Sequence, residues 1–320
     1  MFFLRLNAIF ASNLTKKMLN RRILRIKAFK VIYSRTEDAT MTLKEAESQL
    51  ELSCEATRDL YLFMLAIAGP LTEEAKNRIE AARGKFNPTE EELHPNMKFT
   101  RNRIAPLLEE DPDFNKIVQK KKLSWDQEDV FLRHLYETLR TRDYYKAYME
   151  SGEDSLAEDA ALFRTIYENE FEDNPDLETI LEGLSIWWND DLAYALNRCC
   201  RTIEELGKGM RWSLPPLYMS EMSDKAESDK AFVVKLLRAA FAHYEEMVES
   251  IAAITPKWDR SRICSTDLAL IVAGLAEKAA FPDLPSGIII NEYVEISKYY
   301  STPESRAFVN GILDKLLNSN

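Results

Sequence analysis

The chain has 320 residues, of which 42 are Lys or Arg and 53 are Asp or Glu, and 46% of the residues are hydrophobic. This composition is typical of a folded globular protein and excludes a wholly disordered chain. The absence of any run of about 18 apolar residues argues against a transmembrane helix. Leu, Ala, Glu and Lys are abundant while Gly and Pro are few, so we expect an all-α fold.

Positive charge is concentrated at the start of the chain. The first 35 residues contain nine Lys or Arg and no acid, which leaves 33 basic residues against 53 acidic ones in residues 36–320. Such an asymmetry suggests a local anion-binding surface. Within this part, we expect residues 1–17 to be a loose extension or Met18 to be the natural start, with a basic transit peptide as a minor alternative.

The first predicted helix spans residues 20–35, in the stretch NRRILRIKAFKVIYS. At about 100° per residue, Arg21, Arg22 and Arg25 project from one face, and Tyr33 lies near its edge. Guanidinium groups bind phosphate oxygens bidentately, and single-stranded RNA stacks on aromatic and guanidinium planes. The alternative is that the arginines are solvated and that Tyr33 only packs.

The middle of the chain predicts further helices at 42–55 and 56–67, another after Pro70, and one that Ser124 caps and that runs to about Met149. Residues 147–197 contain 14 Asp or Glu and a single basic residue, Arg164. We interpret this segment as a solvated acidic face that repels nucleic acid.

The last third predicts a long helix at 228–250, an apolar helix at 263–279, a helix at 290–300 and a final helix after Ser301. Gly311 lies inside the final helix, where glycine costs about 1 kcal/mol relative to alanine. We expect a close helix crossing at Gly311 to explain this cost.

The sequence carries no recognisable catalytic motif. It has no glycine-rich phosphate loop, no nucleophile elbow and no metal-binding motif. We interpret the four cysteines as buried thiols, since no Cys-x-x-Cys pair occurs. We therefore expect no enzyme activity, no cofactor and no metal.

Two segments resemble the NusB family of bacterial transcription antitermination factors. INEYVEISKYYSTPESRAFVNGILDKL at 290–316 is similar to the family's closing signature, including Asn291, Glu292 and Lys298. The stretch RRILRIKAFKVIYS is similar to the arginine-rich motif with which members begin. The resemblance implies an all-helical, two-subdomain fold in the cytoplasm.

The resemblance also implies partners and a site. The implied partners are boxA-like single-stranded RNA, the ribosomal protein NusE and the RNA polymerase elongation complex during ribosomal RNA transcription, with no membrane. The implied RNA-binding residues are Arg21, Arg22, Arg25, Tyr33, Arg306 and Phe308. Tyr33 and Asp267 are the candidates for contact with NusE. Phe308 has helical spacing that more often marks a core position.

The chain departs from the family in length and charge. Members are less than half as long, so we expect an N-terminal region at 18–225 with a helical insertion and a NusB-like domain at 226–320. The insertion either follows residues 42–83 or comprises 36–225, with the helix at 228–250 then belonging to the family fold. Val272 and Gly287 occupy commonly basic positions. The alternative functions are a protein–protein scaffold, which predicts arginines masked by acids of the insertion, and a ribosome-assembly factor.

Overall fold

The computed structural model describes residues 18–188, 190–218, 228–255 and 263–318. These residues form helices and no strand, which confirms the expected all-α class. None of the helices in this part of the chain has the length and apolar character that crossing a bilayer would demand.

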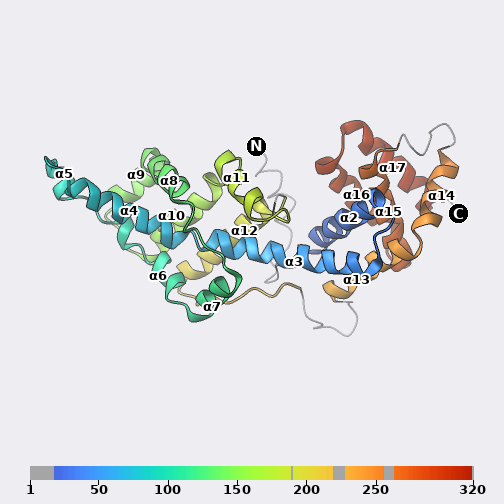
Figure 1. Ribbon diagram of the computed structural model, residues 1–320, viewed down its shortest axis with the longest axis horizontal. Helices are drawn as coiled ribbons and strands as arrows, with labels where there is room; N and C mark the ends of the chain where they lie inside the picture. The colour runs from blue at the N-terminus through green and yellow to red at the C-terminus, as the bar shows by residue number, and fades with distance from the viewer. Residues whose placement is uncertain (1–17, 189, 219–227, 256–262, 319–320) are drawn as a thin grey trace. The chain divides into compact units, whose positions relative to one another are not determined.

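The described chain divides into two compact units (Figure 1). The first, called the insertion here, comprises residues 56–215, and the second, called the NusB-like unit, comprises residues 17–55 and 216–320. The arginine helix therefore lies in the same unit as the C-terminal helices, which differs from the expected boundary between 225 and 226. The division matches neither alternative for the added region in full, because residues 43–55 of α3 belong to the unit of the arginine helix and residues 56–83 belong to the insertion.

The NusB-like unit contains α2 (Arg21–Glu37), the first part of α3 (Leu43–Leu65), α13 (Asp229–Ala242), α14 (Tyr244–Ile254), α15 (Ser265–Ala280), α16 (Ser286–Tyr300) and α17 (Pro303–Asn318). Helix α15 is its centre and packs against α2, α13, α16 and α17. Nearly every residue from Leu268 to Ala276 is buried, because helices cover α15 on several sides.

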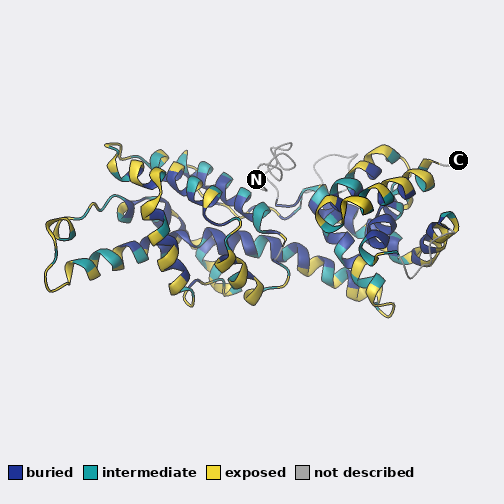
Figure 2. Cartoon of the chain, turned by 90° about the horizontal axis from the view of Figure 1, so that it is seen from above, coloured by how far each residue is buried: buried dark blue, intermediate teal, exposed yellow. Residues whose placement is uncertain are grey.

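The insertion contains the rest of α3, then α4 (Ala68–Arg83), α5 (Glu90–Leu93), the 3₁₀ turn η1 (Phe99–Arg101), α6 (Ile104–Glu109), α7 (Pro112–Lys121), α8 (Asp129–Thr141), α9 (Asp143–Glu150), α10 (Leu156–Asn169), α11 (Pro175–Leu184) and α12 (Leu192–Gly207). Helices α10 and α12 pack along each other. In each unit the buried residues line the helix faces that meet and the exposed residues face outward (Figure 2).

Several helix boundaries differ from the predicted ones. The pair of helices expected at 42–55 and 56–67 is the single helix α3, and the helix expected to run to Met149 is divided into α8 and α9. The long helix expected at 228–250 is broken at His243 into α13 and α14. Helix α17 begins as predicted after Thr302, whose hydroxyl accepts a hydrogen bond from the backbone N–H of Ser305.

Two expectations about single residues are wrong. A side chain added at Gly311 would meet nothing within 4 Å, so no close crossing explains this glycine. The close crossing lies at Gly274 in α15, where an added Cβ would come within 2.8 Å of Leu313 Cδ2. Cys54, Cys199 and Cys200 are buried thiols as expected, but Cys264 is exposed. Burial raises the pKa of Cys200 to about 12.

Candidate nucleic-acid interface

Helix α2 places the arginine-rich motif against the C-terminal helices. Asn20 begins the helix, and its side chain accepts a hydrogen bond from the backbone N–H of Ile23 at 2.9 Å. The side chains of Leu24, Ala28 and Val31 are buried and belong to the apolar face of the helix. The helix packs on α15 and α13. The orientation of α2 is thus fixed by its apolar face, and the arginines lie beside it.

Each of the four arginines in α2 is paired with an acid from a different C-terminal helix. The pairs are Arg21–Asp229 from α13, Arg22–Glu292 from α16, Arg25–Glu277 from α15 and Arg35–Glu245 from α14. All four acids lie outside the insertion. The arginines are therefore masked, but by acids of their own unit and not by the insertion acids that the scaffold alternative predicts.

Arg25 forms the most buried of these pairs. Its Nε and Nη2 atoms donate to the two carboxylate oxygens of Glu277 at 2.8 and 2.6 Å. Glu277 is fully buried and also accepts a hydrogen bond from the hydroxyl of Tyr293 at 2.9 Å. Burial disfavours the charged guanidinium, but the hydrogen bond and charge of Glu277 outweigh it and raise the pKa of Arg25. An RNA phosphate could reach Arg25 only by displacing a buried carboxylate.

Arg22 forms a bidentate pair at the edge of the same cluster. Its Nε and Nη2 atoms donate to the carboxylate of Glu292 at 2.9 and 2.6 Å. Arg25 Nη1 lies 3.4 Å from the same carboxylate. Burial opposes the ionisation of Glu292, but the hydrogen bond from Arg22 and the charges of both arginines prevail and lower the pKa of Glu292. The side chain of Arg22 is 25% exposed, so solvent reaches this pair.

Arg21 is the most exposed arginine of the predicted trio. Its side chain is 43% exposed, and its Nε lies 3.7 Å from the carboxylate of Asp229, a looser contact than those of Arg22 and Arg25. Its guanidinium also lies 4.8 Å from the ring centroid of Phe232, which is within the range of a cation–π contact. Of the three predicted arginines, Arg21 therefore exposes the largest share of its side chain to solvent.

The other predicted RNA-binding residues are only partly accessible. Tyr33 is 38% exposed, while Arg306 and Phe308 in α17 are half-buried. The Nε atom of Arg306 is buried without a hydrogen-bond partner in the described part of the chain. These three residues keep surface available for contact with RNA or protein.

Asp267 lies in an interior position that the partner prediction did not expect. It is buried in the first turn of α15 and accepts a hydrogen bond from the Ser301 hydroxyl at 2.5 Å. Ser301 ends α16, just before the turn into α17. Asp267 therefore ties α15 to this turn, and direct contact with a partner would require that tie to open.

The two commonly basic positions differ in what they could hold. Val272 is completely buried in α15, where a basic side chain would lose its hydration. Gly287 is exposed in the first turn of α16, and a side chain added there would meet nothing within 4 Å. The loss of charge at Gly287 thus reflects the residue type alone and not a lack of space.

The sequence prediction missed the acids that complete the arginine cluster. Glu292 belongs to the Asn291–Glu292 pair of the C-terminal signature, but the sequence analysis assigned it no role, and Glu277 was not considered. Since Arg25 and Glu277 are separated by 252 positions, no local pattern links them. The sequence offered one signal for such pairing: the arginine-rich motif is basic, and the distant C-terminal signature contains acids such as Glu292.

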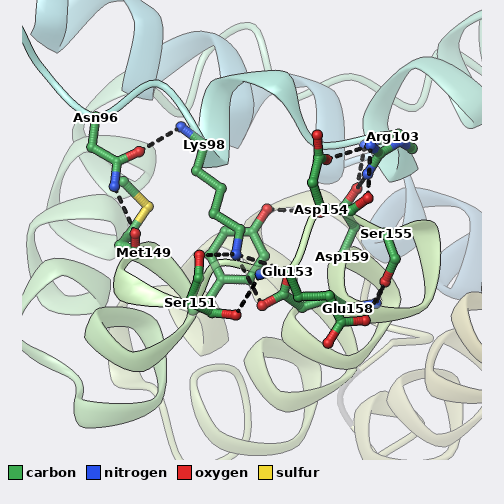
Figure 3. Close-up of polar contacts among 11 residues, drawn as sticks. Asn96, Lys98, Arg103, Met149, Ser151, Glu153, Asp154, Ser155, Glu158 and Asp159 are labelled. Carbon is green, nitrogen blue, oxygen red and sulfur yellow. Dashed lines mark hydrogen bonds and ion pairs between the residues drawn. The ribbon is translucent and has the colours of Figure 1, made fainter.

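Basic side chains of the insertion are also paired with acids. Figure 3 shows Lys98 and Arg103 directed at the segment that leads into α10. Lys98 pairs with Glu158 at 2.8 Å, and Arg103 pairs with Asp159 at 2.9 Å and with Asp154. The described residues include no group of three or more His, Cys, Asp or Glu side chains placed to hold a metal ion. Pairing with acids is therefore common to basic side chains of both units.

Comparison with known proteins places the family likeness in the C-terminal part of the chain. The model of the NusB family matches residues 193–318, a stretch that includes nearly all of α12 of the insertion and does not include α2. The transcription antitermination protein NusB of Methylacidiphilum infernorum is 35% identical over 113 residues, which cover 35% of this chain and 79% of that protein. The protein of the same name from Koribacter versatilis is 30% identical over 112 residues, which cover 35% of this chain and 77% of that protein.

A third relative, the NusB protein of Acetivibrio thermocellus, is 35% identical over 97 residues, which cover 30% of this chain and 67% of that protein. No solved structure matches the chain. The relatives thus align over most of their own length with about a third of this longer chain, which confirms the resemblance noted in the sequence. The chain belongs to the NusB family.

Proposed function

We propose that the protein is an RNA-binding transcription antitermination factor that acts with NusE on boxA-like RNA during ribosomal RNA transcription. The observation that carries the proposal is the family match to proteins named for antitermination, together with an arginine helix in the same compact unit as the matched C-terminal helices. The RNA polymerase elongation complex is the further partner that this role requires.

The geometry refines the residues that would contact RNA. Arg21 is the primary phosphate contact because its side chain is the most exposed of the predicted trio, and Arg22 lies beside it. Tyr33, Arg306 and Phe308 contribute the remaining surface, with Tyr33 available to either RNA or NusE. Arg25 and Asp267 are assigned to packing because of their burial.

A salt series with a boxA-like RNA tests the proposal. Affinity is measured with and without NusE for the wild type, for Arg21→Ala and for the control Arg133→Ala, which removes an exposed arginine of the insertion. We expect Arg21→Ala to weaken binding and to flatten the salt slope by about 0.7, the value of one phosphate contact to a single strand. Arg133→Ala should leave both quantities unchanged.

One observation keeps the scaffold alternative open: all four α2 arginines are paired with acids, although these acids belong to their own unit and not to the insertion. It predicts that the wild type fails to bind RNA even in the presence of NusE. That result would replace the antitermination proposal with a protein–protein role for the same fold.

A further inference from the structure

Glu292 forms a close bidentate pair with an arginine at a place that solvent can reach. Both carboxylate oxygens of Glu292 accept hydrogen bonds from Arg22, at 2.9 and 2.6 Å. The two side chains are 19% and 25% exposed, whereas the Arg25–Glu277 pair is almost fully enclosed. Glu292 therefore lies at the border between the interior cluster and the surface of α2.

A carboxylate and a phosphate compete for the same donors of a guanidinium group. Both bind its planar fork through two parallel hydrogen bonds, so one edge of the fork holds only one of them at a time. Arg22 donates through Nε and Nη2 to Glu292, which therefore occupies one of the two edges at which a phosphate can bind. Arg21 differs because its Nε lies 3.7 Å from the carboxylate of Asp229, a longer contact than the bidentate pair of Arg22.

We propose that Glu292 competes with RNA phosphate for Arg22 and thereby limits the RNA affinity of the arginine helix. The inference rests on the proposed function, since it assumes that this face of α2 meets RNA. Glu292 is a positioning residue in this scheme, because its carboxylate stays paired with Arg22 until a phosphate replaces that carboxylate. Binding at Arg22 then requires the exchange of one bidentate partner for another.

A double-mutant cycle tests the competition. Wild type, Glu292→Gln, Arg22→Ala and the double variant are titrated with the boxA-like RNA and NusE across a salt series. Glu292→Gln should bind RNA several-fold more tightly, with a salt slope steeper by about 0.7 because one more phosphate contact forms. Arg22→Ala should cost little in the wild type but should abolish the gain in the Glu292→Gln background.

Two controls separate this effect from net charge and from misfolding. Glu249→Gln in α14 makes the same charge change at an exposed position of the same unit and should leave affinity unchanged. Glu292→Asp keeps the charge but shortens the side chain, so it should give an intermediate gain even if Glu292→Gln unfolds. Thermal melts of all variants identify those that remain folded.

The outcomes distinguish the inference from the proposed function. If the wild type binds RNA but Arg22→Ala costs the same in both backgrounds, the competition is overturned and the proposed function stands. If only Glu292→Gln binds RNA, the competition is supported and the wild-type RNA role fails. If no folded variant binds RNA, both proposals are overturned.

Discussion

Gly274 and Gly311 lie in neighbouring helices of the NusB-like unit but meet different surroundings. A Cβ at Gly274 would lie 2.8 Å from Leu313 Cδ2 and 3.3 Å from Tyr293 Cδ2, and both neighbours are fully buried. A Cβ at Gly311 would meet no atom within 4 Å. The first glycine is required by the approach of α15 and α17, while the second only adds backbone freedom to the unfolded chain.

Alanine substitutions at the two glycines should therefore act in opposite directions. Gly311→Ala should raise the free energy of unfolding by up to about 1 kcal/mol, the difference in helix propensity. Gly274→Ala should lower it by about 1–3 kcal/mol, because the methyl group overpacks a core that cannot shift. Chemical denaturation measures both values. A stabilising Gly274→Ala would show that α15 and α17 can move apart.

At the scale of single residues, the sequence predicted the types of contact better than the partners. An arginine on a helix is chemically suited to phosphate and to carboxylate alike. The sequence showed that Arg21, Arg22 and Arg25 share a face, and the structure agrees. It could not show that acids more than 200 residues away occupy them, because that depends on how α13, α15 and α16 pack.

At the scale of helices, the sequence predicted where these helices lie but not where a helix is interrupted. The family-like signature and the apolar periodicity located α2, α15, α16 and α17 closely. No proline or glycine in the sequence marks the break at His243. Tyr244, the first residue after the break, is buried, and its hydroxyl donates to Thr36 at 2.9 Å while Arg35 lies over its ring. The break therefore coincides with a contact to α2, and the helix propensity of the local sequence cannot reveal such a tertiary contact.

Because of the Arg25–Glu277 pair, we expect a single substitution that removes one charge to weaken the packing of α2. Glu277→Gln leaves the buried Arg25 charge without its principal counter-ion, and removing one partner of a buried pair costs about 3–5 kcal/mol. We expect a loss of this size in the free energy of unfolding, measured by denaturant titration. The exposed control Glu249→Gln should change it by less than about 0.5 kcal/mol. Equal effects would show that Arg25 finds another partner.

At the scale of the whole molecule, the insertion carries the chain's entire excess of acid. Residues 56–215 contain 21 Lys or Arg and 32 Asp or Glu, a balance of −11, which equals the net charge of the chain. The remaining residues contain 21 basic and 21 acidic side chains. The basic start of the chain is therefore balanced by acids within its own part of the sequence, including those that pair with α2. The insertion therefore adds a net negative charge to a sequence that is otherwise neutral.

The two stretches of the NusB-like unit that precede and follow the insertion in the sequence lie close together. Cys54 and Tyr218 share a hydrogen bond, although 163 residues separate them in the sequence. The backbone N–H of Met18 donates to the carbonyl of Pro216 at 2.8 Å, and that of Leu19 to Leu217 at 3.1 Å. Adjacent entry and exit points are typical of a domain inserted into a loop of another domain.

Replacing residues 56–215 with a short Gly/Ser linker should consequently leave the NusB-like unit folded. We expect the shortened protein to keep a helical circular dichroism spectrum and to unfold cooperatively, because α2 and α13 to α17 retain their shared core and all four arginine pairs. Its denaturant slope should fall, since less surface is exposed on unfolding. A product that is helical but unfolds without cooperativity would show that the NusB-like unit depends on the insertion for its folding. The intact helix α3, which continues from one unit into the other, would then be required.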